Sequence, residues 1–204
     1  MCGIVGYVGP REVVPLLIDG LRRLEYRGYD SAGVAVVADG GLETRRAEGK
    51  LDRLIERLRE QPLSGSYGVA HTRWATHGKP TERNAHPVVD SKNRIAIIHN
   101  GIIENFLVIK RRLLAEGWTF ATDTDTEVIA NLVSSYYAGD LAAAVKRAVG
   151  ELEGMYACAL IGTESTLGDD EEIVAVRQGT PLVLGLGQGE SFLASDPAAL
   201  IAHT

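Results

Sequence analysis

Short runs of apolar and β-branched residues, each bounded by Gly, Asp or Pro, recur along the chain and predict β-strands. They lie at residues 3–8, 33–38, 67–73, 94–99, 155–162, 172–177 and 191–195. Another segment, residues 11–25, repeats apolar positions with the period of a helix, at Leu17, Leu21 and Leu24. Further helices are predicted at residues 50–60, 103–116 and 141–152.

One more helix is predicted to begin at Thr124. The sequence Thr124-Asp125-Thr126-Glu127 fits the capping-box pattern, in which a Thr and a Glu side chain bond to backbone N–H groups of the first turn. An apolar run begins at Val128, as expected for a helix that packs against a core.

The order of these elements favours an α+β fold. Strands cluster at both ends of the chain and helices in the middle, so the strict alternation of a parallel α/β fold fails. We therefore expect antiparallel sheets with helices on their outer faces. Residues 163–172 are polar and predict an exposed loop between two strands. Residues 185–190 (GLGQGE) predict a turn, because no helix follows as a dinucleotide-binding loop requires.

Length, charge and cysteine count restrict the class of protein. The 204 residues favour one compact domain, residues 1–204, over the alternative of two small domains, and we interpret the end of the chain as a boundary within a longer protein. A net charge of −6 argues against nucleic acid as a partner, because phosphates are bound by clustered Lys and Arg. No secretory signal or membrane-spanning run is visible. Two cysteines are too few for a disulfide framework and indicate a cytoplasmic protein.

Cys2 is the first candidate for chemistry. Removal of Met1 would leave Cys2 with a thiol and a free α-amino group, whose pKa of roughly 7.7–8.0 lets it accept the thiol proton near neutral pH. One residue would then supply both a nucleophile and its general base. The alternative is that Cys2 is a small apolar residue at the start of a buried strand.

Three further positions each allow a functional and a structural interpretation. Arg73, in the segment HTRWATHG (71–78), suits a bidentate contact with a carboxylate, or an ordinary surface ion pair. Asn100-Gly101 is typical of a hairpin turn, yet the Asn amide and the Gly N–H can also form an oxyanion hole. Asp125 is favoured by the helix dipole, or it binds an ammonium group.

A metal site is not predicted. Four of the five histidines lie within thirty positions, but their spacing matches no compact ligand pattern, and we expect them to bond to backbone or substrate instead. These histidines are His71, His77, His86 and His99.

Taken together, six segments resemble the glutaminase domain of the glutamine–fructose-6-phosphate aminotransferases, which are N-terminal-nucleophile (class II) glutamine amidotransferases. Their order and spacing agree over essentially the whole chain. The segment LEYRGYDSAG separates this family from the amidophosphoribosyltransferases, which usually carry a histidine before Arg-Gly. The six segments are CGIVGYVG (2–9), RRLEYRGYDSAG (22–33), HTRWATHG (71–78), NAHPV (84–88), HNGIIEN (99–105) and TDTE (124–127).

This resemblance implies a four-layer αββα sandwich of two antiparallel sheets and a set of residue roles. Cys2 would attack the carboxamide of glutamine, with Asn100 and the Gly101 N–H stabilising the oxyanion. Arg73 would hold the substrate α-carboxylate and Asp125 its α-ammonium. The remaining pocket residues implied are Trp74, Thr76, His77 and His86, with Arg27 ordering the loops near the nucleophile.

The resemblance also implies the wider reaction. A γ-glutamyl thioester on Cys2 would be hydrolysed to glutamate without a metal or organic cofactor. The ammonia would pass to a sugar-isomerase region, absent from this chain, that makes glucosamine 6-phosphate from fructose 6-phosphate in a homodimeric full-length protein. Two alternatives remain, the glutaminase domain of another amidotransferase, such as an amidophosphoribosyltransferase, and a non-catalytic glutamine-binding domain.

Overall fold

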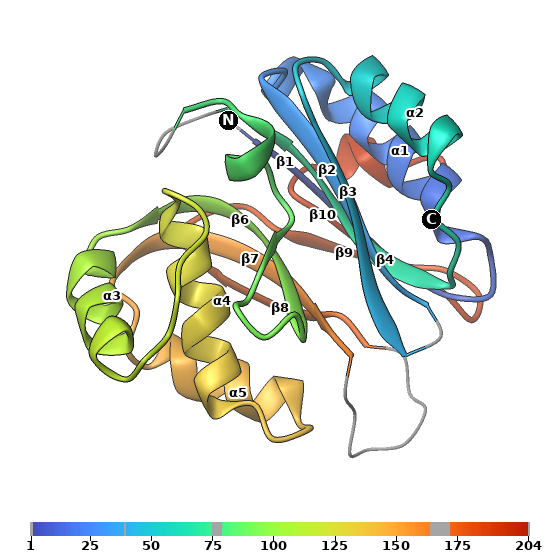
Figure 1. Cartoon of the computed structure of the whole chain (residues 1–204). Helices are drawn as coiled ribbons and strands as arrows, with labels where there is room; N and C mark the ends of the chain where they lie inside the picture. The colour runs from blue at the N-terminus through green and yellow to red at the C-terminus, as the bar shows by residue number, and fades with distance from the viewer. Residues whose placement is uncertain (1, 39, 75–78, 164–171, 204) are drawn as a thin grey trace.

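Two antiparallel sheets pack face to face and are covered by helices on both outer sides (Figure 1). The computed structural model describes residues 2–38, 40–74, 79–163 and 172–203. The first sheet has the order β3-β2-β4-β1-β10-β9 and the second the order β5-β6-β7-β8. Helices α1 and α2 cover the first sheet, and α4 and α5 cover the second (Figure 1). The predicted α+β sandwich of four layers is confirmed.

The bounds of the elements follow chain order. The strands are β1 (Gly3–Val8), β2 (Ser31–Ala38), β3 (Gly41–Glu48), β4 (Tyr67–Arg73), β5 (Val88–Val89), β6 (Ile95–Ile103), β7 (Gly154–Gly162), β8 (Val174–Gln178), β9 (Val183–Leu186) and β10 (Ser191–Ala194). The helices are α1 (Val13–Leu24), α2 (Leu51–Glu60), α3 (Phe106–Ala115), α4 (Asp125–Tyr136) and α5 (Leu141–Val149), with short 3₁₀ turns η1 (Glu25–Arg27), η2 (Glu82–Asn84) and η3 (Pro197–Ala199).

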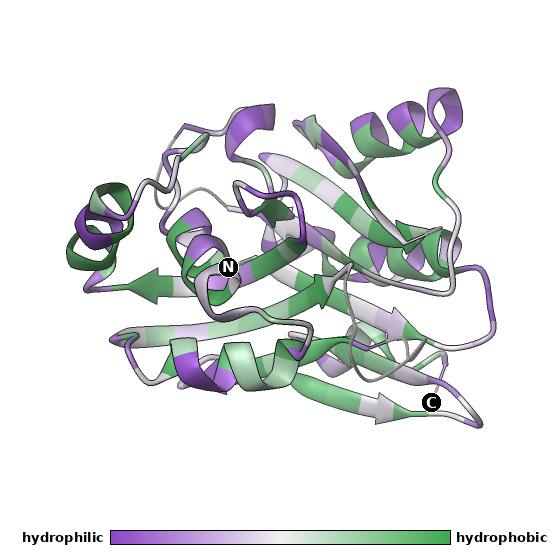
Figure 2. Cartoon of the chain, turned by 60° about the horizontal axis from the view of Figure 1, so that its bottom comes forward, coloured by the Kyte–Doolittle hydropathy of each residue, from purple (hydrophilic) through white to green (hydrophobic). Residues whose placement is uncertain are grey.

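The core forms three apolar layers, because the central strands are buried on both faces. On β6, Ile95 and Ile97 pack toward α4 and α5, whereas Ala96 and Ile98 pack between the sheets. This alternation follows from the two-residue period of a strand. Because both faces of these strands are buried, consecutive residues are apolar, and the strands are predominantly green in Figure 2.

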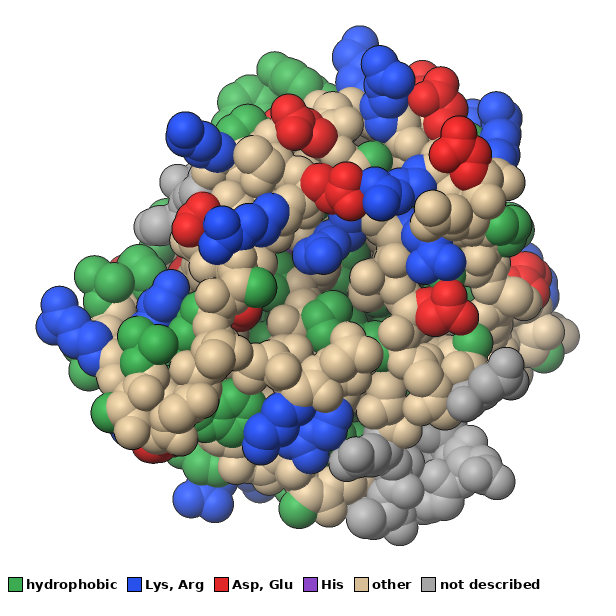
Figure 3. All heavy atoms as spheres, in the orientation of Figure 1, with side chains coloured by type: hydrophobic (Ala, Val, Ile, Leu, Met, Phe, Trp, Pro, Cys, Tyr) green, Lys and Arg blue, Asp and Glu red, His purple; other side chains and the backbone are tan. Residues whose placement is uncertain are grey.

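The surface of the molecule carries side chains of both charges (Figure 3). On the face seen in Figure 3, Lys and Arg are interspersed with Asp and Glu instead of gathering in one basic area. Within the described residues, no helix combines the length and apolar character that crossing a membrane requires.

Most predicted elements are confirmed, but three strands were not predicted. β3 is an edge strand of mostly polar sequence, β9 is short and contains Gly185, and β5 has two residues. The helix predicted from residue 103 begins at Phe106 instead, because Ile103 pairs with Gly154 in the sheet. Of the loop predicted at 163–172, residues 164–171 lie outside the described part of the chain. The turn predicted at 185–190 is confirmed from Gly187, whose N–H donates to the Glu190 carbonyl between β9 and β10.

Helix α4 begins after Thr124, as predicted, but the prediction that Thr124 and Glu127 form a capping box is wrong. The Thr124 side chain makes no capping bond and contacts the hydroxyl of Thr122 instead. The buried Glu127 carboxylate accepts the N–H groups of Ala121 and Thr122, each at 2.6 Å. Glu127 therefore holds the preceding loop against the helix instead of closing the helix end.

The hairpin-turn interpretation of Asn100-Gly101 is also wrong. Both residues lie inside β6 and pair with Ala157 and Tyr156 of β7. Gly101 has a φ of +123°, a conformation that side-chain-bearing residues rarely adopt. A Cβ at this position would lie 2.1 Å from the Met155 carbonyl oxygen. Only glycine therefore fits here without strain.

Gly101→Ala is expected to lower the free energy of unfolding by at least about 2 kcal/mol, since strain and a backbone clash add. Gly117→Ala is the matched control, because Gly117 also has a positive φ, of +89°, but a Cβ there meets nothing within 4 Å. Urea denaturation of both variants checks this. Equal losses of stability would show that the contact with Met155 is unimportant.

Candidate active site

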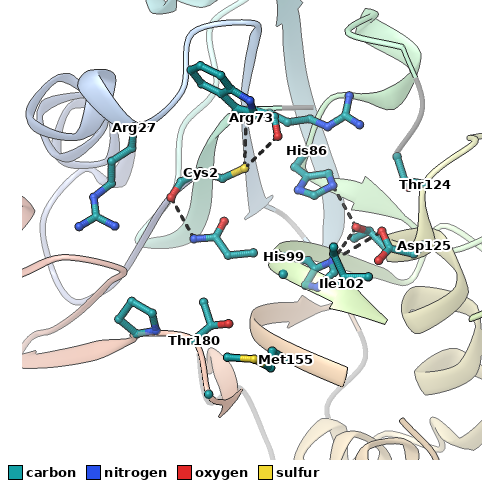
Figure 4. A pocket seen from close by; sticks show the side chains of 16 residues that line it. Cys2, Arg27, Arg73, His86, His99, Ile102, Thr124, Asp125, Met155 and Thr180 are labelled. Atoms are coloured by element: carbon teal, nitrogen blue, oxygen red, sulfur yellow. Dashed lines mark hydrogen bonds and ion pairs between the residues drawn. The ribbon is translucent and has the colours of Figure 1, made fainter. Parts of the chain in front are cut away.

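A cavity of about 420 Å³ lies where residues from both sheets converge (Figure 4). Its wall brings together residues from the chain start, the end of β4, the C-terminal part of β6, the beginning of α4 and the beginning of β7. Most of the predicted site residues line it. The lining residues are Cys2, Arg27, Arg73, Trp74, His86, His99, Asn100, Gly101, Ile102, Thr124, Asp125, Thr126, Met155, Gly179, Thr180 and Pro181.

The Cys2 thiol is held at the cavity by the backbone of Trp74. Its Sγ accepts the Trp74 N–H at 3.1 Å and contacts the Trp74 carbonyl oxygen at 3.4 Å. Burial raises the pKa of the Cys2 thiol, although the hydrogen bond from Trp74 opposes this. The thiol therefore needs a nearby proton acceptor to become a thiolate.

Asn100 lies beside Cys2 and is held at both ends of its amide. Its Nδ2 donates to the Cys2 carbonyl oxygen at 3.0 Å, and its Oδ1 lies 2.9 Å from His71 Nε2. The adjacent Gly101 also lines the cavity. The structure therefore places an amide donor and a glycine backbone in the same cavity wall as the thiol.

Two buried groups of opposite charge line the same cavity. Arg73 ends β4 and donates to the Lys79 carbonyl oxygen at 3.3 Å. Burial lowers the Arg73 pKa, but a guanidinium stays charged at any physiological pH. Asp125 begins α4, and its Oδ2 accepts the Ile103 N–H at 3.0 Å. The cavity therefore offers a cation and an anion to one ligand.

The other predicted residues lie around this centre. Trp74 is half exposed at the cavity and packs edge-on against Tyr29. Arg27 lies on the opposite side of Cys2 from Asp125 in Figure 4 and forms an ion pair with Asp196. The predictions for Thr76 and His77 lie outside the described residues.

Comparison with known proteins decides the family. The sequence profile of a family described as the glutamine amidotransferase domain matches residues 71–202. The chain belongs to this glutamine amidotransferase family.

Two curated relatives match the amidotransferase chain over its whole length. The glutamine–fructose-6-phosphate aminotransferase (isomerizing) of Thermus thermophilus is 53% identical, and that of Clostridium tetani is 48% identical. In each case 100% of this chain matches 33% of the relative. The chain therefore spans about one third of the length of the curated relatives that it matches.

A solved structure shows the same fold. The glutamine phosphoribosylpyrophosphate amidotransferase from B. subtilis superposes with a TM-score of 0.83 at 26% sequence identity, over 98% of this chain and 43% of that one. This likeness supports the assignment of the sandwich to the amidotransferase fold.

Some residues of the amidotransferase cavity were not predicted. Ile102 and Met155 meet because β6 and β7 pair in a register that places them opposite each other. Thr180 and Pro181 arrive from the turn after β8. Long-range strand pairing brings these residues to the site, and no local pattern marks them. Thr126 was not predicted either, although it lies within the segment TDTE that carries the family resemblance. His99, which was expected to bond to backbone or substrate, also lines the cavity.

Three buried histidines lie close together at the cavity: His86 and His99 line it, and His71 lies behind its wall. Thr126 Oγ1 lies 3.0 Å from His86 Nε2 and 2.9 Å from His99 Nδ1, and the rings of His71 and His86 lie 4.4 Å apart. Among the residues that the structure describes, no group of three or more His, Cys, Asp or Glu side chains is arranged to hold a metal ion. Burial lowers the pKa of His71 to about 3 and that of His86 well below its usual value.

Acid should therefore destabilise the fold through His71 and His86. Below pH 6.5 the unfolded chain binds protons that the folded chain excludes, so the free energy of unfolding falls as the pH falls. For His71 alone, the expected loss between pH 7 and pH 5 is about 2 kcal/mol. Urea denaturation of the wild type and of His71→Gln at both pH values checks this. The free energy of unfolding of His71→Gln should fall by about 2 kcal/mol less between pH 7 and pH 5 than that of the wild type. Identical pH dependence in the two proteins would contradict the assignment.

Proposed function

We propose that this chain hydrolyses L-glutamine to L-glutamate and ammonia through a thioester on Cys2. The observation that carries the proposal is one cavity lined by the Cys2 thiol, the Asn100 amide and the opposite charges of Arg73 and Asp125. These groups correspond to the parts of glutamine, which has a carboxamide at one end and a carboxylate and an ammonium at the other.

The proposal requires removal of Met1. The free α-amino group of Cys2, with a pKa of roughly 7.7–8.0, would then accept the thiol proton. Burial raises the thiol pKa, which is the reason a dedicated base is needed. A retained Met1 would convert that amine into an amide nitrogen, which is not a base.

Asn100 and Gly101 are proposed to stabilise the oxyanion. The Asn100 Nδ2 carries two hydrogens, and one bond to the Cys2 carbonyl leaves the second for a substrate oxygen beside the thiol. The Gly101 N–H is the proposed second donor. Fixed donors of this kind act where negative charge develops in the transition state.

The amino-acid end of glutamine is proposed to lie between Arg73 and Asp125. Arg73 would bind the α-carboxylate through its planar guanidinium, and Asp125 would bind the α-ammonium. Simple amides lack both charges and would bind poorly. The pocket would be completed by Trp74, Thr76, His77 and His86, with Arg27 ordering the adjacent loops.

The proposed reaction balances without a cofactor. The sulfur attacks the carboxamide carbon, and the amine passes the thiol proton to the leaving nitrogen. The C–N bond then breaks, which releases ammonia and leaves a γ-glutamyl thioester. Water attacks that thioester, which gives glutamate and restores the thiol.

The whole protein is proposed to be a glutamine–fructose-6-phosphate aminotransferase, with residues 1–204 as its glutaminase domain. Identities of 53% and 48% to relatives of that name, against 26% to the phosphoribosylpyrophosphate enzyme, support this choice. A sugar-isomerase region of the same polypeptide would use the ammonia to make glucosamine 6-phosphate. We place the full-length protein in the cytoplasm as a homodimer.

A product assay tests the proposed function. The purified Met-free chain should convert glutamine to glutamate and ammonia in equal amounts, and it should form no amino sugar when fructose 6-phosphate is added. Asparagine should react far more slowly, because its carboxamide is one methylene closer to the anchored end. Glutamine binding without ammonia release would favour a non-catalytic binding domain instead.

A further inference from the structure

We propose that His71 is a positioning residue that fixes the orientation of the Asn100 amide, an inference that rests on the proposed function. His71 lies on β4, and its side chain is fully buried behind the cavity wall. Its Nε2 lies 2.9 Å from Asn100 Oδ1. Asn100 lies on β6, so this hydrogen bond joins one sheet to the other.

The two ends of the Asn100 amide differ in what they can bind. Oδ1 only accepts hydrogen bonds, so His71 Nε2 must carry the proton that joins them. The other end, Nδ2, donates to the Cys2 carbonyl oxygen. A flipped amide would place Oδ1 against that carbonyl, and two acceptors would face each other. The His71 bond therefore keeps the N–H donors of Asn100 directed toward Cys2.

The protonation state of His71 suits this task. Burial lowers its pKa to about 3, so the ring is neutral at physiological pH and has a single N–H. That hydrogen must be on Nε2 to reach Asn100. Neither the bond nor the amide orientation should change between pH 5 and pH 8.

Matched variants separate positioning from a general structural role. His71→Leu removes the donor, and we expect kcat for glutamine to fall at least tenfold while KM changes less than threefold. His71→Gln presents a carboxamide N–H at a similar reach and should retain most of the wild-type kcat. Thermal unfolding establishes that both variants are folded. A folded His71→Leu with wild-type kcat, or a folded His71→Gln as slow as His71→Leu, would overturn the proposal.

A double-mutant cycle tests whether His71 acts through Asn100. If it does, the double variant His71→Leu/Asn100→Ala should have a kcat within threefold of Asn100→Ala alone. Losses that multiply would mean that His71 acts independently of Asn100, which contradicts the inference.

The tautomer provides a readout that needs no activity. NMR of the chain labelled with ¹⁵N-histidine, with His71 identified by its absence in His71→Gln, should show Nε2–H at pH 5 and at pH 8. An Nδ1–H tautomer would overturn the inference by itself. If the wild-type chain releases no ammonia from glutamine, the proposed function is wrong. The tautomer of His71 would still test whether His71 orients the Asn100 amide.

Discussion

Cys2→Ala is expected to release ammonia from glutamine at less than about one thousandth of the wild-type rate, because no other group in the described cavity wall can form the thioester. The fold should be unchanged, since Cys2 is only half-buried and lies just before the start of β1. Steady-state ammonia release and thermal unfolding of the variant check both statements.

Cys158 supplies the matched control for this experiment. It is the second cysteine of the chain, and it is buried on β7 opposite His99. Burial raises its pKa strongly, so its thiol is unreactive. Cys158→Ala should keep the wild-type rate. Ammonia release by Cys2→Ala within tenfold of wild type would rule out Cys2 as the nucleophile.

The second large effect is expected for Asp125→Asn, which should raise KM for glutamine by about 30-fold or more. The variant removes the charge that would bind the α-ammonium, and losing one partner of a buried charge pair costs about 2–5 kcal/mol. An amide oxygen can still accept the Ile103 N–H, so the beginning of α4 should stay folded. Initial-rate kinetics over a wide range of glutamine concentration provide the test.

Arg73→Ala should raise KM to a similar extent by removing the partner of the α-carboxylate. Arg53→Ala is the matched control, because Arg53 is 72% exposed and pairs with Glu56 on the helix surface. KM should be unchanged in that control. An unchanged KM in both Asp125→Asn and Arg73→Ala would break the assignment of the two anchors.

The layers of the fold were predictable because local patterns specify them. Leu17, Leu21 and Leu24 are fully buried on one side of α1, as their helical spacing predicts. β3 was not predicted because an edge strand exposes polar side chains, and such a sequence resembles a loop. The turn interpretation of Asn100-Gly101 failed because pairing with β7 in the folded chain overrides the local preference of this dipeptide for a turn.

The cavity was predictable only through the family resemblance. Cys2, Arg73, Asn100 and Asp125 span more than 120 positions, and no spacing in the sequence shows that they meet. His71 was expected to bond to backbone or substrate, whereas its side chain bonds to Asn100 across the two sheets, a contact that only the folded chain forms. Glu127 likewise bonds to the preceding loop and not to the capping residue that its position suggests.

The most direct test compares two preparations of the chain that differ only at the N-terminus. In one, intact mass shows that Cys2 is the first residue and its amine is free; in the other, that amine is acetylated. The first should release ammonia from glutamine at the full rate, and the second should be inactive, although both are folded. Ammonia release at the same rate by the acetylated chain would contradict the central claim that the amine of Cys2 activates its own thiol.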